Sequence, residues 1–292
     1  MTPIAILITL FVLYVATLVF MAWVSVHPMR IPIFFSPGAL GVAQEPVELV
    51  AADGVRMAGW WVPTVESRGV IVLAHGYMMN RAEPSVLAAW LAGQGWSCLL
   101  MDFPGHGSSG QRRVGFGWTE RNDVAVMLRE ARKRADGAPV VAWGSSMGAA
   151  ASAFALAEDG SLADGLVLDS AYGSLVGAVS GWWYWLGGRK LQIILGPVIW
   201  FGRMLLPFNP NRVRVSDALR NVHVPTLLLH GDRDSLATPD QAEQNLAALG
   251  EQGKLVWFAG CAHSEGRWVH PVQYHLELKK YLDEVEKNFR RA

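Results

Sequence analysis

Ser146 lies in the pentapeptide GSSMG (144–148), which has the form G-x-S-x-G. The apolar run 140–143 before it is typical of a buried strand, and the small residues after it are typical of a helix. A serine on a tight turn between a strand and a helix is the nucleophile-elbow arrangement, in which glycines let neighbouring backbone approach closely. A pentapeptide this short also occurs by chance. Its significance therefore depends on whether the chain supplies a base, a carboxylate and donors for an oxyanion.

Polar residues also follow three other predicted strands. The stretch 75–77 (His-Gly-Tyr) follows the apolar run from residue 69, Asp232 and Asp234 follow 225–231, and His263 follows 254–260. In open α/β sheets, ligands bind at the carboxyl ends of the strands. Together with Ser146, these make four candidate stretches, all at the ends of predicted strands. The serine, the aspartates and His263 occur along the chain in the order Ser, Asp, His. This conjunction is far more specific than the pentapeptide.

The chemistry of these residue types assigns each a role. A serine hydroxyl needs an imidazole to take its proton, and the imidazole needs a carboxylate to fix its tautomer. We therefore assign Ser146 as nucleophile, His263 as base and then acid, and Asp234 as the residue that orients His263. The oxyanion needs N–H donors, for which we expect the backbone of Met147, at the start of a helix, and of Tyr77.

Alternatives to these assignments remain open in the sequence. Ser145 could be the reactive serine, although the elbow pattern places it before the apex of the turn. Asp232 or Asp169 could orient the imidazole in place of Asp234. The side chains at 77–79 (Tyr-Met-Met) line an acyl pocket in one interpretation and are ordinary loop packing in the other. Three histidines lie beside glycines or in turns and are expected to fix loops: His75, His106 and His230.

The elements around these residues alternate between strand and helix. Apolar strands are predicted near 69–76, 97–103, 139–145, 164–171, 225–231 and 254–260, with helical patterns near 83–93, 118–135, 147–158, 239–249 and 271–289. Continuously apolar strands separated by helices predict a mostly parallel sheet covered on both faces. The alternation around Asp53-Gly54, between 46 and 63, predicts an antiparallel hairpin at its start.

The N-terminal segment Ile4–Val26 has no charged side chain. This length is enough to span roughly 30 Å of hydrocarbon as a helix. We predict a retained single-pass membrane anchor in residues 1–30, followed by a catalytic domain in 31–292. A cleaved signal peptide and a buried core helix are the alternatives, but no basic n-region or A-x-A site is present. Arg30 alone flanks the segment closely, which weakly favours a cytoplasmic catalytic domain.

The segment 172–211 interrupts the alternation of strands and helices. It is rich in tryptophan, leucine and isoleucine, and its charges are Arg189, Lys190 and Arg203. The segment is too long for an ordinary connection. We predict a helical cap insertion at about 172–215. A second membrane span over 191–206 is the alternative, which Gly196, Pro197 and Arg203 disfavour.

The amino-acid composition limits the kinds of partner that the chain is expected to bind. Twenty-five basic and 25 acidic residues give zero formal net charge, which argues against nucleic acid as a partner. Cys98 and Cys261 lack metal-ligand spacing, and we expect free thiols rather than a disulfide. Neither the oligomeric state nor the natural substrate follows from the sequence.

These motifs together resemble those of the α/β-hydrolase superfamily. The matching stretches are 75–77, DFPGHGSSG (102–110), GSSMG (144–148), HGDRDSLATP (230–239) and CAH (261–263). The N-terminal anchor and the ending HSEGRWVHPVQYHLELKKYL are similar to membrane-anchored bud-emergence-like and ABHD-type hydrolases, and also to lysophospholipase and monoglyceride-lipase-like proteins. The resemblance implies an α/β-hydrolase fold, the catalytic roles given above and no metal or organic cofactor.

The expected function is hydrolysis of carboxylic esters of an amphipathic or lipid-like substrate. Ser146 disfavours the chemistry of the related dehalogenases and epoxide hydrolases, which use aspartate at the elbow. Met147 makes peptidase activity less favoured, since the prolyl-peptidase relatives usually have tryptophan there. Two other hypotheses remain: an acyl-protein or acyl-CoA thioesterase, which uses the same machinery, and a catalytically silent membrane-anchored scaffold.

Overall fold

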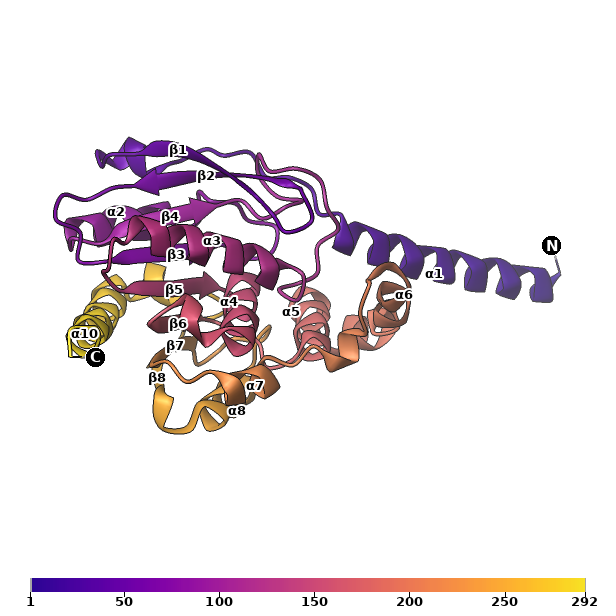
Figure 1. The fold of residues 1–292 in the computed structure, drawn as a ribbon. Helices are drawn as coiled ribbons and strands as arrows, with labels where there is room; N and C mark the ends of the chain where they lie inside the picture. Colours follow the sequence, from indigo (N-terminus) through magenta and orange to yellow (C-terminus); the bar gives the residue numbers. More distant parts are fainter. Residues whose placement is uncertain (1, 292) are drawn as a thin grey trace.

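The computed structural model describes residues 2–291. One eight-stranded sheet forms its centre, in the order β1-β2-β4-β3-β5-β6-β7-β8 (Figure 1). The first two pairings, β1 with β2 and β2 with β4, are antiparallel, and the other neighbouring pairs are parallel. The strands are β1 (Glu45–Val50), β2 (Arg56–Val62), β3 (Val70–Ala74), β4 (Ser97–Met101), β5 (Val140–Ser145), β6 (Gly165–Asp169), β7 (Thr226–Gly231) and β8 (Gly253–Phe258).

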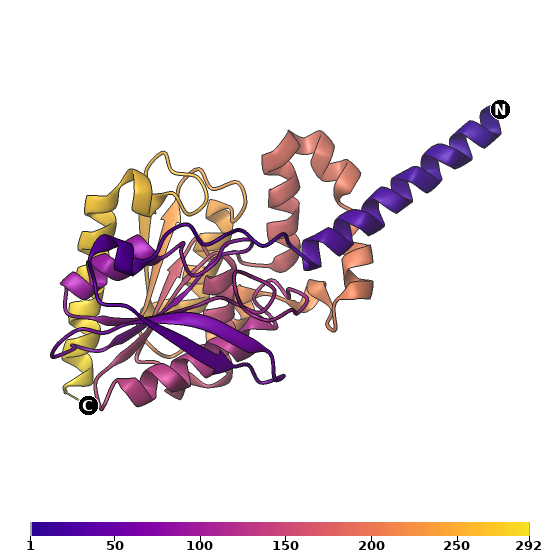
Figure 2. The same ribbon diagram turned by 90° about the horizontal axis from the view of Figure 1, so that it is seen from above.

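Helices cover both faces of this sheet. α3 and α4 lie over one face, and α2 and α10 lie over the other (Figures 1 and 2). The helices are α1 (Pro3–Val26), α2 (Ser85–Gly93), α3 (Glu120–Arg134), α4 (Met147–Glu158), α5 (Leu175–Leu195), α6 (Val198–Leu205), α7 (Val215–Ala218), α8 (Pro239–Leu249), α9 (Gly266–Val269) and α10 (Pro271–Phe289). Short 3-10 turns lie at Pro37–Leu40, Gly160–Leu162, Pro210–Arg212, Leu219–Asn221 and Gly250–Gln252.

The central strands β3 to β7 are buried at every position because both of their faces are covered. In β3, Val72 belongs to the core on the α3–α4 side, whereas Ile71 and Leu73 belong to the core on the α2–α10 side. Successive side chains of a strand point to opposite faces, so a strand buried on both sides has no polar alternation. The predicted fold class, a mostly parallel sheet that begins with an antiparallel hairpin, is confirmed.

The segment predicted as a cap folds into α5 and α6, between β6 and β7. α5 departs from helical geometry at Gly187 and Gly188, and Gly196 and Pro197 separate it from α6. The run predicted as an alternative membrane span is therefore divided between two helices. Both helices lie at the same end of the sheet as α1 (Figure 2).

α1 is an apolar helix that points away from the sheet (Figures 1 and 2). Within residues 2–291 it is the one helix long and apolar enough to cross a membrane, a test of length and composition that a signal sequence also passes. The two cysteines are buried and free, as predicted.

Candidate active site

Ser146 occupies a strained turn between β5 and α4. Its backbone has φ 51° and ψ −108°, and α4 begins at the next residue. A Cβ on Gly144 would lie 2.3 Å from the carbonyl carbon of Gly148, and a Cβ on Gly148 would lie 2.1 Å from the oxygen of Ala74. Only glycine fits at either position, because real Cβ atoms do not approach other atoms so closely. The G-x-S-x-G spacing is therefore a packing requirement of this turn.

Ser146, His263 and Asp234 form one hydrogen-bonded chain. The Oγ of Ser146 lies 2.8 Å from Nε2 of His263, and Nδ1 of the same ring lies 2.7 Å from Oδ2 of Asp234. The other carboxylate oxygen of Asp234 accepts hydrogen bonds from the backbone N–H of Leu236 and Ala237. Because a carboxylate only accepts, Nδ1 carries the proton and Nε2 is free to accept the serine proton.

The loops after β7 and β8 are bound to each other, and this holds Asp234 and His263 in place. A Cβ on Gly231 would lie 2.3 Å from the oxygen of Cys261, so glycine lets the two loops cross. The N–H of Arg233 donates to the same oxygen at 2.9 Å. Asp232 accepts from the N–H of Gly260 at 2.6 Å and so joins the two loops rather than contacting the imidazole.

Asp169 and Ser145, which the sequence left open for catalytic roles, are bound to different partners. Asp169 accepts from the hydroxyl of Tyr274 at 2.9 Å and forms an ion pair with Arg267 at 3.3 Å. The hydroxyl of Ser145 lies 3.3 Å from that of Ser264. Of the candidate carboxylates, the structure thus brings Asp234 to His263.

Two backbone N–H groups beside Ser146 are available for a ligand. Among residues 2–291, neither Met147 nor Tyr77 donates a backbone hydrogen bond. Met147 is the first residue of α4, where the helix dipole favours negative charge. These are the two donors predicted for an oxyanion.

The ring of Tyr77 belongs to an aromatic group beside the site. Its centroid lies 5.2 Å from that of Phe116, 6.4 Å from that of Trp182 and 6.4 Å from that of His106. Its hydroxyl donates to the backbone oxygen of Ser25, at the end of α1. The ring therefore contacts α5 and is hydrogen-bonded to α1.

Sequence reasoning missed a buried ionic network behind the Tyr77 loop. Arg267 in α9 pairs with Glu83 and with Asp169, and all three side chains are almost fully buried. The carboxylate of Glu83 accepts a 2.7 Å hydrogen bond from the N–H of Gly76, the residue before Tyr77. No motif or spacing in the sequence indicates this network, because its members are far apart along the chain.

The charges of the network shift the pKa values of its members. Burial acts to raise the pKa of Glu83, but Arg267 and the Gly76 N–H outweigh it and hold this pKa below its ordinary value. Burial raises the pKa of Asp169, and Arg267 offsets only part of that effect. Burial acts to lower the pKa of Arg267, but the two carboxylates raise it above its ordinary value. Arg267 thus pairs with both Glu83 and Asp169, whose pKa values are shifted in opposite directions.

The three histidines expected to fix loops are all buried. His75 donates from Nδ1 to the oxygen of Gly76 at 2.8 Å and accepts at Nε2 from the N–H of Phe103 at 3.0 Å. His230 donates to the oxygen of Ala237 at 2.6 Å. Burial lowers the pKa of His75 and His230, and lowers the pKa of His106 to about 3. All three rings are neutral at pH 7.

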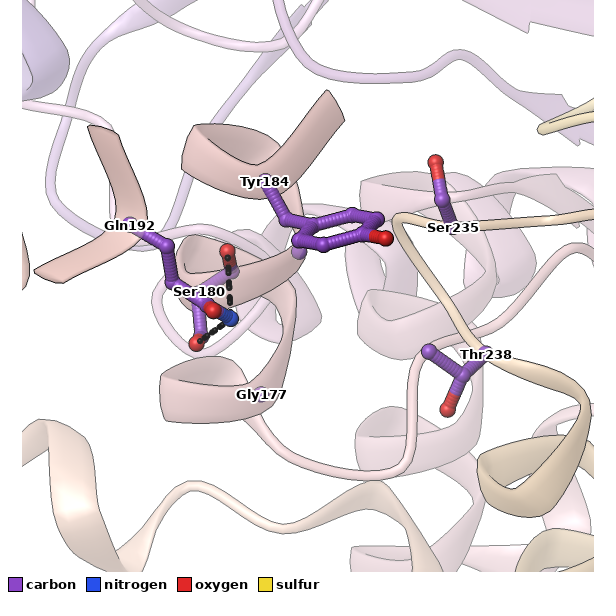
Figure 3. A pocket seen from close by; sticks show the side chains of 7 residues that line it. Gly177, Ser180, Tyr184, Gln192, Ser235 and Thr238 are labelled. Atoms are coloured by element: carbon purple, nitrogen blue, oxygen red, sulfur yellow. Dashed lines mark hydrogen bonds between the residues drawn. The ribbon is translucent and has the colours of Figure 1, made fainter. Parts of the chain in front are cut away.

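A pocket of about 380 Å³ lies between α5 and the loop that follows Asp234. Figure 3 shows the ring of Tyr184 between the α5 segment that carries Ser180 and the loop that carries Ser235. The amide of Gln192 donates to the hydroxyl of Ser180 at 2.8 Å (Figure 3). The residues that line it do not include Ser146, His263 or Asp234. Within residues 2–291 no group of three or more His, Cys, Asp or Glu side chains is arranged to hold a metal ion.

The sheet order and a serine elbow after a central parallel strand define an α/β-hydrolase fold. A Pyrococcus furiosus esterase has this fold, with a TM-score of 0.75 and 21% identity over 89% of this chain and 98% of that one.

Sequence comparisons find a family match over part of the chain and several distant relatives. The family described as Serine aminopeptidase, S33 matches residues 65–194. An uncharacterised protein of Mycobacterium tuberculosis is 27% identical over 237 residues, which cover 80% of this chain and 77% of that protein. A monoacylglycerol lipase of Mycolicibacterium smegmatis is 39% identical over 62 residues, 21% of this chain and 22% of that one. The chain thus has the α/β-hydrolase fold that its motifs predicted, and residues 65–194 resemble the S33 serine aminopeptidase family.

Proposed function

We propose that this protein is a membrane-anchored serine hydrolase that cleaves carboxylic esters of an amphipathic, lipid-like substrate. The observation that carries the proposal is the hydrogen-bonded chain Asp234–His263–Ser146, next to two N–H groups with no partner in residues 2–291. Residues 1–30 are the proposed anchor, and 31–292 the catalytic domain with its cap at about 172–215. Esterases among the structural neighbours and a lipase among the relatives support ester hydrolysis.

The proposed reaction has two stages, acylation of Ser146 and hydrolysis of the acyl-enzyme. Ser146 Oγ attacks the carbonyl carbon of the ester while its proton passes to Nε2 of His263. The carbonyl oxygen becomes an oxyanion and accepts hydrogen bonds from the N–H groups of Tyr77 and Met147. The intermediate collapses, the alcohol leaves with the proton from His263, and the acyl group stays on Ser146. Water then attacks the acyl-enzyme with His263 as base, which releases the acid and restores the serine.

Asp234 contributes by stabilising the imidazolium that forms twice in each turnover. Its carboxylate is buried, and two backbone N–H groups hold it in position. It therefore fixes both the tautomer and the orientation of His263 without taking the proton itself.

The composition of the cap insertion favours an ester over a peptide with a free amino terminus. An aminopeptidase must hold the ammonium group of its substrate, and a carboxylate does this best. No aspartate or glutamate occurs in the sequence between Asp169 and Asp217, which includes all of α5 and α6. The insertion is instead apolar with a few cations, which suits an acyl chain.

Replacement of Ser146 tests the proposal. We expect Ser146→Ala to lower kcat/KM for p-nitrophenyl esters by about 10⁴- to 10⁶-fold. The matched control is Ser145→Ala, the adjacent serine, which is expected to stay within about threefold of wild type since its hydroxyl has no role in the proton transfer. If purified Ser146→Ala hydrolysed these esters as fast as wild type, the assignment would be wrong.

Two further measurements separate the competing hypotheses. A fluorophosphonate probe is expected to label wild type and Ser145→Ala but not Ser146→Ala, and no adduct on folded wild type would favour a silent scaffold. Competition between an acyl-CoA and an oxygen ester of the same chain length measures the preference for thioesters.

A further inference from the structure

The free part of α1 is too short to cross a bilayer by itself. From Ile6 to Leu13 every residue is exposed, and contacts with the rest of the molecule begin at Tyr14. The segment Pro3–Leu13 extends about 16 Å as a helix, whereas the hydrocarbon core of a bilayer is about 30 Å thick. If α1 spans the membrane, the part that follows Leu13 must therefore also lie in it.

That part of α1 is packed against the cap helices. Leu18 and Ala22 are buried against Trp183 of α5 and Val198 of α6. The hydroxyl of Tyr14 donates to the backbone oxygen of Ile194 at 2.7 Å. Both ribbon views show α5 and α6 beside the half of α1 nearer the sheet (Figures 1 and 2). A bilayer that covers Tyr14–Ala22 must therefore meet α5 and α6 as well.

We propose that the outer surface of α5 and α6 is inserted at the headgroup–acyl boundary of one lipid leaflet, beside α1. The proposal rests on the membrane anchor proposed above and goes beyond it. The protein would hold the membrane by one spanning helix and by the surface of its cap, rather than by a flexible tether.

The side chains of the cap helices fit this environment. Seven large apolar side chains of the two helices are exposed: Tyr184, Trp185, Leu186, Ile193, Ile194, Trp200 and Met204. Exposed apolar patches on a protein mark interaction sites. Tryptophan and tyrosine are enriched at membrane interfaces.

α6 is apolar on two opposite sides. Val198 and Leu205 belong to the cluster that packs on α1, whereas Trp200 is 72% exposed and Met204 79% exposed. Residues four apart lie on one side of a helix, so Trp200 and Met204 form one patch. α6 therefore has one apolar side that packs on α1 and a second, exposed apolar patch beside the basic side chain of Arg203.

The charges of the cap insertion also fit a lipid leaflet. Arg189, Lys190 and Arg203 are exposed, and no acidic residue lies between Asp169 and Asp217. Long basic side chains bury their stems in apolar surroundings while their charged ends reach headgroups. A surface with apolar side chains and only basic charges fits a leaflet with anionic headgroups.

The inserted cap would give substrate a direct route from the membrane. Trp182 of α5 contacts the ring of Tyr77, whose N–H is a proposed oxyanion donor, and the Tyr77 hydroxyl is bonded to Ser25 of α1. The cap and the end of α1 thus lie against the loop beside Ser146. An acyl ester dissolved in the leaflet would reach Ser146 without crossing water.

The experiment measures the depth of three labelled sites in the full-length protein. Single cysteines replace Leu7 in α1, Met204 in α6 and Val65 in the loop after β2, all exposed positions. Each is labelled with the fluorophore NBD and reconstituted into vesicles of phosphatidylcholine and phosphatidylglycerol (4:1). Native Cys98 and Cys261 are buried, and labelled wild type serves as the blank. Lipids with a doxyl group on acyl carbon 5 or 12 and iodide in the water serve as quenchers.

We expect at least a threefold stronger quenching of the Met204 label by 5-doxyl lipid than by iodide. The Leu7 label should also be quenched by lipid, and the Val65 label only by iodide.

If Met204→Cys behaves like Val65→Cys while Leu7→Cys is quenched by lipid, the inserted cap is wrong and the anchor stands. If Leu7→Cys is quenched by iodide, the anchor is wrong, and lipid quenching at Met204 alone would still support the inserted surface. A Met204 label shielded from both quenchers would show that a second copy of the chain covers the surface, which overturns the proposal.

Discussion

Asp169 ends β6, and Asp232 and Asp234 follow β7, so all three lie at the carboxyl ends of neighbouring strands. Their hydrogen-bond partners differ. Asp169 accepts from Tyr274 and pairs with Arg267, whereas Asp232 accepts from Gly260. Of the three, Asp234 contacts His263. A carboxylate whose oxygens are occupied by other buried partners is not free to orient an imidazole, since each lost bond leaves an uncompensated group.

Glu83→Gln is predicted to slow catalysis without weakening substrate binding. The glutamine oxygen can still accept from Gly76, but the buried Arg267 loses one of its two carboxylates. We expect kcat to fall about tenfold through a displaced Tyr77 N–H, with KM nearly unchanged, because one oxyanion donor is worth about 10²- to 10³-fold when fully lost. We expect the free energy of unfolding to fall by about 3 kcal/mol. Steady-state kinetics and urea unfolding measure the two effects.

The matched control for this variant is Glu277→Gln on α10. Glu277 forms ion pairs with exposed Lys254 and Lys280, so its loss is expected to change both quantities little. A Glu83→Gln protein with wild-type kcat and lowered stability would show that the network serves folding and does not position the Tyr77 loop.

The buried histidines predict acid sensitivity of the fold. Burial lowers the pKa of His75 and His230 and lowers the pKa of His106 to about 3. Below pH 6.5 the unfolded chain binds protons that the folded protein excludes, so the free energy of unfolding falls as the pH drops from about 6.5 towards the folded pKa. Between pH 7 and pH 5, His106 alone accounts for a loss of about 2 kcal/mol.

His106→Phe tests this assignment. The variant is expected to lose about 2 kcal/mol less stability than wild type between pH 7 and pH 5, since phenylalanine takes up no proton. Urea unfolding in detergent micelles at the two pH values gives the difference. An equal loss in both proteins would mean that His106 does not contribute to the acid sensitivity.

The elbow between β5 and α4 depends on close backbone contact with the neighbouring strand β3. Gly148→Ala would place a Cβ 2.1 Å from the oxygen of Ala74, the last residue of β3. We predict a loss of about 1–3 kcal/mol in unfolding free energy and a lower kcat, because the first turn of α4 must move away from β3. Thermal unfolding and ester hydrolysis measure both effects.

Gly93→Ala is the matched control for this substitution. Gly93 is the last residue of α2, and a Cβ at this position would have no neighbouring atom within 4 Å. We expect it to leave kcat unchanged and to keep or raise stability, since alanine favours the helix. If Gly148→Ala were as stable and active as Gly93→Ala, the close approach at the elbow would not constrain the site.

At the scale of the whole molecule, α1 is predicted to hold the protein in the membrane. Leu10→Arg combined with Leu13→Arg places two charges in the exposed part of the helix, at a cost of about 2.5–3.5 kcal/mol each at the centre of a bilayer. We expect the double variant to move from the membrane pellet to the supernatant after carbonate extraction. Val65→Arg, at an exposed loop, should stay in the pellet, and equal retention of the double variant would argue against a spanning α1.

The sequence by itself determined the fold class and the local form of the turn at Ser146. Continuously apolar strands with helical periodicity between them indicate a sheet that is buried on both faces. Each of these patterns lies within one segment of the chain. The spacing Gly144–Ser146–Gly148 likewise records contacts within one turn and with one neighbouring strand. Such patterns are visible along the chain because each depends on few residues.

Contacts between distant segments were decided only in the tertiary structure. The sequence left three aspartates open as partners of the imidazole, and folding brings Asp234 to His263 through the crossing of the β7 and β8 loops. The pairing of Glu83 with Arg267 and the packing of Leu18 on Trp183 have no sequence signal. The physical reason is that many residue types can form a charge pair or an apolar contact, so the type of a residue says little about its partner. Which residues meet depends on the path of the whole chain.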